Sequence, residues 1–217
     1  MDFDIDTILF DFDGTLVEIN IDFTEMKRRI LSLGIAEYGI IPKTDLYVLE
    51  LVENMYNILS EKDVAKAEMF KKQAEEIIVN IELSAAENSR MFPNADVTLK
   101  EIKNRGIKIG IVTRNCRKAV LKSSESAGFV YDLLLTRDDV KKVKPDPSHL
   151  LSALVLLNSR PEKAIMIGDQ PIDIIAGKKA GMKTAAVLNV RPIKDFEELS
   201  PDLILEDISD ILEIFQN

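Results

Sequence analysis

The sequence predicts an α/β fold in which a parallel sheet carries helices on both faces and an all-helical segment is inserted near the N-terminus. Short apolar runs that end in polar loops recur along the chain, which is typical of buried parallel strands. Stretches with helical spacing of apolar residues lie between these runs, as strand–helix–strand crossovers require. Residues 16–90 break this alternation, because they carry helical spacing without a strand.

Six apolar runs are the predicted strands, and the first of them ends directly before an Asp-Phe-Asp-Gly-Thr segment. The runs cover residues 7–10, 107–112, 133–135, 164–167, 184–188 and 203–205.

Three stretches between or after these strands have the spacing of amphipathic helices: residues 94–105, 147–157 and 208–215. The second begins at a proline, which suits the first turn of a helix. Gly106 and Gly181 each follow a helical stretch, where a glycine commonly ends the helix.

The inserted segment repeats apolar residues at helical intervals over residues 46–59 and 64–83. We therefore expect an α/β core of residues 1–15 and 91–217 and a helical domain of residues 16–90. Three residues are expected to interrupt the first part of that domain: Gly34, Gly39 and Pro42.

The composition excludes several classes of protein. The 217 residues are 46% hydrophobic and 30% charged, as in folded globular domains. With 28 basic and 37 acidic residues the net charge is −9, which argues against a broad nucleic-acid interface. A single cysteine, Cys116, excludes an internal disulfide and a cysteine-rich metal site. Without a signal-peptide pattern or an 18-residue apolar run, a cytoplasmic location away from membranes is expected, and the oligomeric state stays open.

Polar residues that carry chemistry follow the predicted strands in four separate stretches. The carboxyl ends of parallel strands share one edge of the sheet, which is where open α/β sheets bind ligands, so we expect these stretches to converge. They contain Asp11, Asp13, Gly14 and Thr15; Thr113, Arg114 and Asn115; Lys144; and Gly168, Asp169 and Asp173.

The residue types in these stretches suit phosphoryl transfer. Carboxylates brought together repel and raise one another's pKa unless a cation lies among them. An all-oxygen ligand set favours a hard cation such as Mg²⁺. One carboxylate is then left for covalent or acid–base work, while a lysine and a hydroxyl group hold anionic oxygens.

Taken in order, the four stretches resemble the motifs of the haloacid dehalogenase (HAD) superfamily of phosphohydrolases, and the resemblance covers the whole chain. The quoted matches are Asp11-Phe-Asp13-Gly14-Thr15, Thr113, Lys144-Pro145 and Gly168-Asp169-x-x-x-Asp173. The inserted helices look like the helical cap of phosphoglycolate phosphatase-like members. The resemblance implies a Rossmann-like core and a cap that closes over the site, excludes water and selects the substrate.

The resemblance also implies a role for each matched residue. Asp11 would attack phosphorus and form an aspartyl-phosphate, and Asp13 would serve as general acid and then as general base. Thr113 would hydrogen-bond the phosphoryl group, and Lys144 would neutralise charge. The implied substrate-binding residues are Thr113, Arg114, Asn115 and Lys144. The implied Mg²⁺ ligands are Asp11, the backbone carbonyl of Asp13, and Asp169, with Asp173 acting through water or by orienting the site.

The chain departs from the family pattern at two places. Thr113 is followed by Arg114 and Asn115 where many relatives have Thr-Asn or Ser-Asn, and Arg114 is either a substrate contact or a surface residue. Asn94 stands where many relatives have glycine. Lys144 is preferred over its neighbours Lys141 and Lys142 because a proline follows it.

Three other features have ordinary structural explanations. His149, the only histidine, is expected to be structural or at the surface, and Cys116 is expected to pack on a helix. The basic residues 27–29 are expected to form a solvated helix face, with contact to an anionic substrate as the alternative.

The predicted function is a Mg²⁺-dependent phosphomonoesterase that acts on a small phosphate ester of the phosphoglycolate or sugar phosphate type. The acid at position 13 favours a phosphatase, because the dehalogenating members lack it. A phosphomutase of the β-phosphoglucomutase type is the alternative, since the same motifs serve both reactions. A non-catalytic binding module is the third hypothesis, because fold alone does not secure function.

Overall fold

The computed structural model describes residues 4–124 and 128–215. The chain divides into two compact units, of which the first contains Met1–Ile19 and Asn88–Asn217 and the second Asn20–Glu87. Each unit has its own hydrophobic core.

A short antiparallel ladder corrects the expectation that residues 16–90 contain no strand. Strand β2 (Val17–Glu18) pairs with β3 (Arg90–Met91), and both belong to the first unit. Two residues are too few to show an alternating pattern, and the pairing depends on a partner far along the chain. This ladder also explains why the unit boundaries, at 19/20 and 87/88, differ from the expected 15/16 and 90/91.

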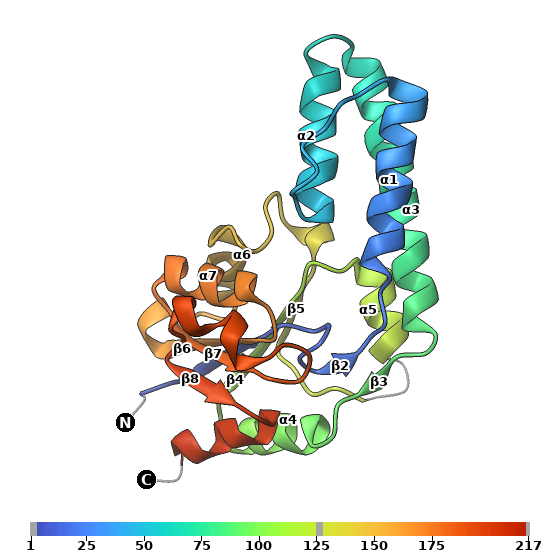
Figure 1. The fold of residues 1–217 in the computed structure, drawn as a ribbon. Helices are drawn as coiled ribbons and strands as arrows, with labels where there is room; N and C mark the ends of the chain where they lie inside the picture. The colour runs from blue at the N-terminus through green and yellow to red at the C-terminus, as the bar shows by residue number, and fades with distance from the viewer. Residues whose placement is uncertain (1–3, 125–127, 216–217) are drawn as a thin grey trace. The chain divides into compact units, whose positions relative to one another are not determined.

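The first unit is built on a six-stranded parallel sheet with the order β5-β4-β1-β6-β7-β8, which confirms the predicted fold class (Figure 1). Each predicted strand is present, within one residue of its expected ends. The strands are β1 (Thr7–Phe10), β4 (Lys108–Val112), β5 (Leu133–Leu135), β6 (Ala164–Gly168), β7 (Lys183–Val187) and β8 (Leu203–Leu205).

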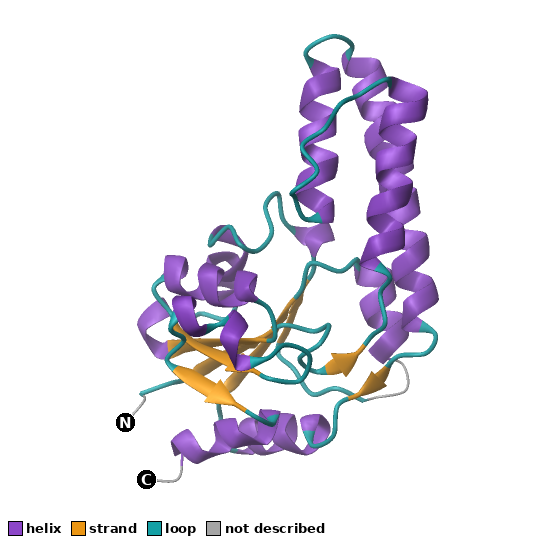
Figure 2. Ribbon diagram, viewed as in Figure 1, coloured by secondary structure: helices purple, strands orange, loops and turns teal. Residues whose placement is uncertain are grey.

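Helices cover both faces of this sheet (Figure 2). Ile8 and Phe10 of β1 face a core shared with α4, α5 and the 3₁₀ helix η5, whereas Leu9 between them faces a core shared with α6 and α7. This alternation follows from the two-residue period of a strand. The helices are α4 (Ala95–Asn104), α5 (Arg117–Ser124), α6 (Ser148–Leu156), α7 (Pro171–Ala180) and η5 (Ile208–Phe215).

The second unit consists of three packed helices, α1 (Phe23–Tyr38), α2 (Val48–Ser60) and α3 (Val64–Ala86). Gly39 ends α1 with a left-handed backbone, as expected, but Gly34 does not interrupt the helix. Gly34 lies inside α1 because a side chain there would overlap Met55 of α2, so the glycine permits close helix packing. Among the described residues, no helix is both long and apolar enough to cross a bilayer.

Candidate active site

Three neighbouring strands bring the predicted site residues to one edge of the sheet. Strand β1 lies between β4 and β6, and Phe10 is in register with Ile111 and Ile167. The residues just beyond the strands are therefore adjacent in space: Asp11 follows β1, Thr113 follows β4 and Asp169 follows β6.

A cluster of three buried carboxylates lies at this edge. Asp11, Asp169 and Asp173 each present an oxygen, and these oxygens lie within 4.8 Å of one another. Asp173 is placed by the first turn of α7, where its Oδ2 accepts a hydrogen bond from the backbone N–H of Gln170 at 3.1 Å. Burial, together with the charges of Asp11 and Asp173, raises the pKa of Asp169 to about 8.

The Lys144 ammonium group meets two of these carboxylates. Its Nζ lies 2.9 Å from Asp11 Oδ1 and 2.7 Å from Asp173 Oδ1, and the side chain is fully buried. Burial alone would lower the pKa of Lys144, but the two carboxylates outweigh it and hold the pKa above its usual value. Burial raises the pKa of Asp173 to about 6, while Lys144 opposes this rise. Lys142 instead pairs with Asp146 at 3.3 Å on the surface.

The donor set of the cluster fits a hard divalent cation. All three groups are carboxylates, and one lysine does not balance their charge when they are ionised. The pKa of Asp169 is elevated first by burial and then by the like charges of Asp11 and Asp173, and a cation among the oxygens would oppose this rise by favouring the ionised form. Asp11, Asp169 and Asp173 are thus the side chains that could hold the metal expected from the sequence.

The Asp13 carboxylate contacts the loop after β4. Thr113 Oγ1 donates to Asp13 Oδ2 at 3.1 Å, and Asn115 Nδ2 donates to Asp13 Oδ1 at 2.9 Å. Arg114 Nη1 donates to the carbonyl oxygen of Lys144 at 2.9 Å, so the guanidinium group connects the loops that carry Thr113 and Lys144. The arrangement brings all the predicted site residues of the core to the same edge; their catalytic roles stay predictions.

Two glycines allow the carboxylates to lie against the backbone. Gly14 has a φ of +83°, and a Cβ built there would overlap the Asp169 carboxylate. A Cβ built at Gly168 would overlap the Asp173 carboxylate. Both positions therefore need glycine for steric reasons, and Gly14 needs it for its backbone conformation as well.

Two hydrogen-bonding residues that support the site were not assigned a role from the sequence. Asn189 Nδ2 donates to the carbonyl oxygens of Gly14 and Thr15, at 3.2 Å each, and thereby holds the turn after β1. Thr15 Oγ1 donates to Asp169 Oδ1 at 3.2 Å. The sequence did contain a signal for Asn189, because this residue directly follows the predicted strand of residues 184–188 and so is expected at the same edge of the sheet.

The remaining residues considered from the sequence take structural positions. His149 is fully buried, and burial lowers its pKa to about 3, so the ring is neutral; its Nδ1 accepts from the backbone N–H of Lys144 at 3.4 Å. Cys116 is buried beside the start of α5. Arg28 pairs with Glu25 at 2.6 Å, and Arg29 approaches the same carboxylate at 3.6 Å, on an exposed part of α1.

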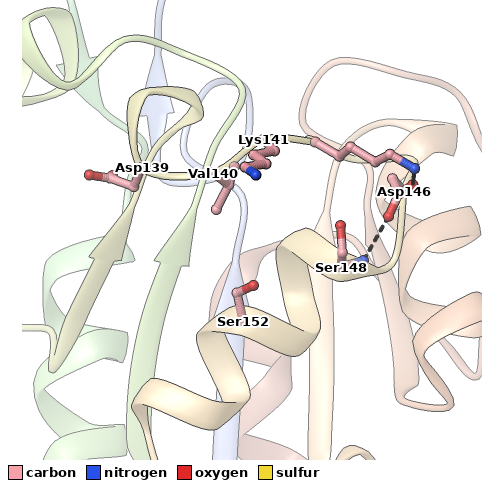
Figure 3. Close-up of a pocket in the computed structure, with 7 residues that line it drawn as sticks. Asp139, Val140, Lys141, Asp146, Ser148 and Ser152 are labelled. Atoms are coloured by element: carbon pink, nitrogen blue, oxygen red, sulfur yellow. Dashed lines mark hydrogen bonds and ion pairs between the residues drawn. The ribbon is translucent and has the colours of Figure 1, made fainter.

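A surface hollow of about 520 Å³ lies beside the loop that carries Lys144 (Figure 3). Ser148 and Ser152 line it from α6, and the Asp146 carboxylate accepts a hydrogen bond from the Ser148 N–H at 2.9 Å. The three clustered carboxylates are not among its lining residues.

Comparison with known proteins shows the family of this chain. Residues 8–187 match the haloacid dehalogenase-like hydrolase family. The pyrophosphatase PpaX of Bacillus cereus strain G9842 is 33% identical over 218 aligned positions, which cover 98% of this chain and 97% of that protein.

Solved structures share the fold. A haloacid dehalogenase-like family hydrolase from Streptococcus pneumoniae is 19% identical with a TM-score of 0.63, over 98% of this chain and 99% of that one. A candidate β-phosphoglucomutase from Thermotoga maritima is 25% identical with a TM-score of 0.64, over the same shares of the two chains. Since the family match covers residues 8–187, which is most of the chain, this chain is an enzyme of the haloacid dehalogenase-like hydrolase family.

Proposed function

We propose that the enzyme is a Mg²⁺-dependent phosphatase that hydrolyses a small phosphate ester through an aspartyl-phosphate on Asp11. The observation that carries the proposal is the meeting of three buried carboxylates with the buried Lys144 ammonium at the ends of adjacent strands. Such a site combines a nucleophile, fixed positive charge and oxygen ligands, and phosphoryl transfer depends on positioning and charge neutralisation.

In the proposed reaction, Asp11 attacks phosphorus while the ester P–O bond breaks, and Asp13 gives a proton to the departing alcohol oxygen. Water then attacks the aspartyl-phosphate, Asp13 takes the water proton, and the Asp11 carboxylate is regenerated. Thr113 and Lys144 hold the phosphoryl oxygens. Bound Mg²⁺, held by Asp11, Asp169 and the backbone carbonyl of Asp13 with Asp173 in support, would supply charge neutralisation.

The substrate class stays within small phosphate compounds. Phosphomonoesters of the phosphoglycolate or sugar phosphate type are our first candidates, and inorganic pyrophosphate is added because PpaX carries that activity in its name. A phosphomutase is the second candidate function, favoured by the similarity to the β-phosphoglucomutase candidate. Free phosphate as the product supports hydrolysis, whereas an isomerised sugar phosphate supports the mutase. We also expect a cytoplasmic enzyme.

The test is phosphate release from p-nitrophenyl phosphate, pyrophosphate and a panel of sugar phosphates, with Mg²⁺ or EDTA. Wild-type protein should release phosphate only with Mg²⁺, and Asp11→Asn should abolish release because it removes the nucleophile. Release that survives in Asp11→Asn would refute the aspartyl-phosphate route. Folded protein that releases nothing from any compound would favour the non-catalytic hypothesis.

A further inference from the structure

The loop after β4 holds the Asp13 carboxylate at both of its oxygens. Thr113 Oγ1 donates to Oδ2 at 3.1 Å, and Asn115 Nδ2 donates to Oδ1 at 2.9 Å. Thr113 is fully buried and Asn115 is only 2% exposed, so water competes little for either donor. The loop after β4 therefore gives the Asp13 carboxylate two donors that are shielded from water.

The surroundings of Asn115 fix the orientation of its amide group. Its Oδ1 accepts from the backbone N–H of Cys116 at 2.8 Å, and its own backbone N–H donates to Thr113 Oγ1 at 3.0 Å. With the amide turned over, its NH₂ would face the Cys116 N–H and its oxygen would face the Asp13 carboxylate, and both contacts would be repulsive. Asn115 thus presents a donor to Asp13.

Thr113 and Asn115 differ in what they can do during the proposed reaction. A hydroxyl group has one proton to donate, so Thr113 cannot donate to a phosphoryl oxygen and to Asp13 at the same time. We propose that Asn115 is a positioning residue that holds Asp13 through Oδ1 while substrate is bound and leaves Oδ2 to carry the proton. The inference rests on the proposed function and replaces the expectation that Asn115 binds substrate directly.

The proton then has a defined path. In the first step the Asp13 Oδ2–H bond breaks as the O–H bond of the alcohol forms, the ester P–O bond breaks and the bond from phosphorus to Asp11 forms. In the second step Oδ2 accepts a proton from water while the oxygen of that water bonds phosphorus and the bond to Asp11 breaks. Oδ1 accepts from Asn115 throughout both steps.

The experiment compares two aryl esters of similar shape, p-nitrophenyl phosphate and phenyl phosphate, in the presence of Mg²⁺. The p-nitrophenolate anion leaves with little need of a proton, whereas phenolate leaves well only when an acid is positioned. Asn115→Ser should therefore lower kcat/KM for phenyl phosphate by roughly tenfold or more and for p-nitrophenyl phosphate by much less, with little change in KM. Asn115→Asp keeps an acceptor for the Cys116 N–H and is the second variant; it removes the donor to Asp13 and should show the same selective loss.

Cys116→Ala is the matched control, because Cys116 lies in the same buried loop and the variant keeps the backbone N–H that bonds Asn115. It should leave kcat/KM unchanged for both esters. In an Asp13→Asn background, Asn115→Ser should cause no further loss, since the residue acts through Asp13. An equal fall for both esters, with a raised KM or a lowered Tm, would overturn the inference alone. Wild-type protein without turnover on either ester would overturn the proposed function, and the inference with it.

Discussion

Single residues decide how closely the loops at the carboxyl ends of the strands approach one another. At Gly14 the backbone is left-handed and the Asp169 carboxylate occupies the space that a Cβ would need. At Gly168 the Asp173 carboxylate does the same. The two carboxylates thus reach their positions because the neighbouring residues, Gly14 and Gly168, have no side chain. At Gly14 this steric requirement adds to the need for a left-handed backbone.

Gly14→Ala should displace Asp169 and lower Mg²⁺-dependent turnover at least tenfold, because the new methyl group and the carboxylate compete for one space. The matched control is Gly106→Ala, since Gly106 has a similar φ of +76° but nothing within 4 Å of its Cβ position. Both variants should lose about 1 kcal/mol of unfolding free energy in urea from backbone strain. Equal activity losses in the two variants would contradict the steric explanation.

At the scale of elements, a short 3₁₀ turn anchors the chain segment that leads to Lys144. In η1 (Arg137–Asp139), the Asp139 carboxylate accepts from the backbone N–H of Thr136 at 2.8 Å and from its hydroxyl at 2.7 Å. The same carboxylate pairs with Arg117 of α5 at 2.7 Å. The Asp139 side chain therefore connects the turn, the residue that follows β5, and α5.

Asp139→Asn should destabilise the protein at pH 7 by about 1 kcal/mol, as the loss of a cap does. Burial alone would raise the pKa of Asp139, but the bonds from Thr136 and Arg117 outweigh it and lower the pKa. A lowered folded-state pKa gives stability that is present above the unfolded value, near 4, and is lost as the pH falls. Urea unfolding should therefore give a lower free energy of unfolding for the variant than for the wild type at pH 7, and this difference should decrease toward pH 3. A constant difference would contradict this.

The elements also show which parts of the fold local sequence controls. The strands of the parallel sheet were predictable because strands buried on both faces read as continuous apolar runs. The β2–β3 ladder was not, since two residues carry no periodic signal. Helix α1 continues through Gly34 because of its packing against Met55, and that contact is invisible in a local pattern.

At the scale of the whole molecule, a net charge of −9 is accompanied by a buried group of like charges at the sheet edge. Gathering three carboxylates with one lysine costs folding free energy in the absence of a cation. A ligand that binds only the folded state raises the free energy of unfolding, and above its Kd this increase grows with the logarithm of the ligand concentration. Metal affinity and folding stability should therefore be coupled.

Mg²⁺ at about a hundred times its Kd should raise the Tm of the wild type by roughly 5–10 °C. At pH 7, Asp169→Asn should raise the Tm of the metal-free protein, because folding forces a carboxyl group with a pKa of about 8 to take up a proton and an amide carries no such cost. The variant should also lose most of the Mg²⁺-induced shift. Differential scanning fluorimetry with EDTA, with Mg²⁺ and with NaCl of matched ionic strength measures both effects. A shift of equal size with NaCl would indicate screening instead of a bound metal ion.

The sequence by itself determined the fold class, the parallel strands and the stretches of polar residues at their ends. This was possible because a buried strand and the polar residues that follow it are both visible in a short stretch of sequence. A parallel topology then brings the carboxyl ends of the strands to one edge of the sheet. The structure adds the order of the strands: β1 lies between β4 and β6, so Thr113, Asp11 and Asp169 are neighbours.

Only the tertiary structure decided which partner each side chain meets. Lys144 lies between Asp11 and Asp173, Asn115 contacts Asp13, and Asn189 holds the turn after β1. Each of these contacts joins residues distant along the chain, and its geometry is set by how loops pack above the sheet. A local pattern of residue types identifies candidates for a site, whereas distances and hydrogen-bond directions arise from the packing of the whole core.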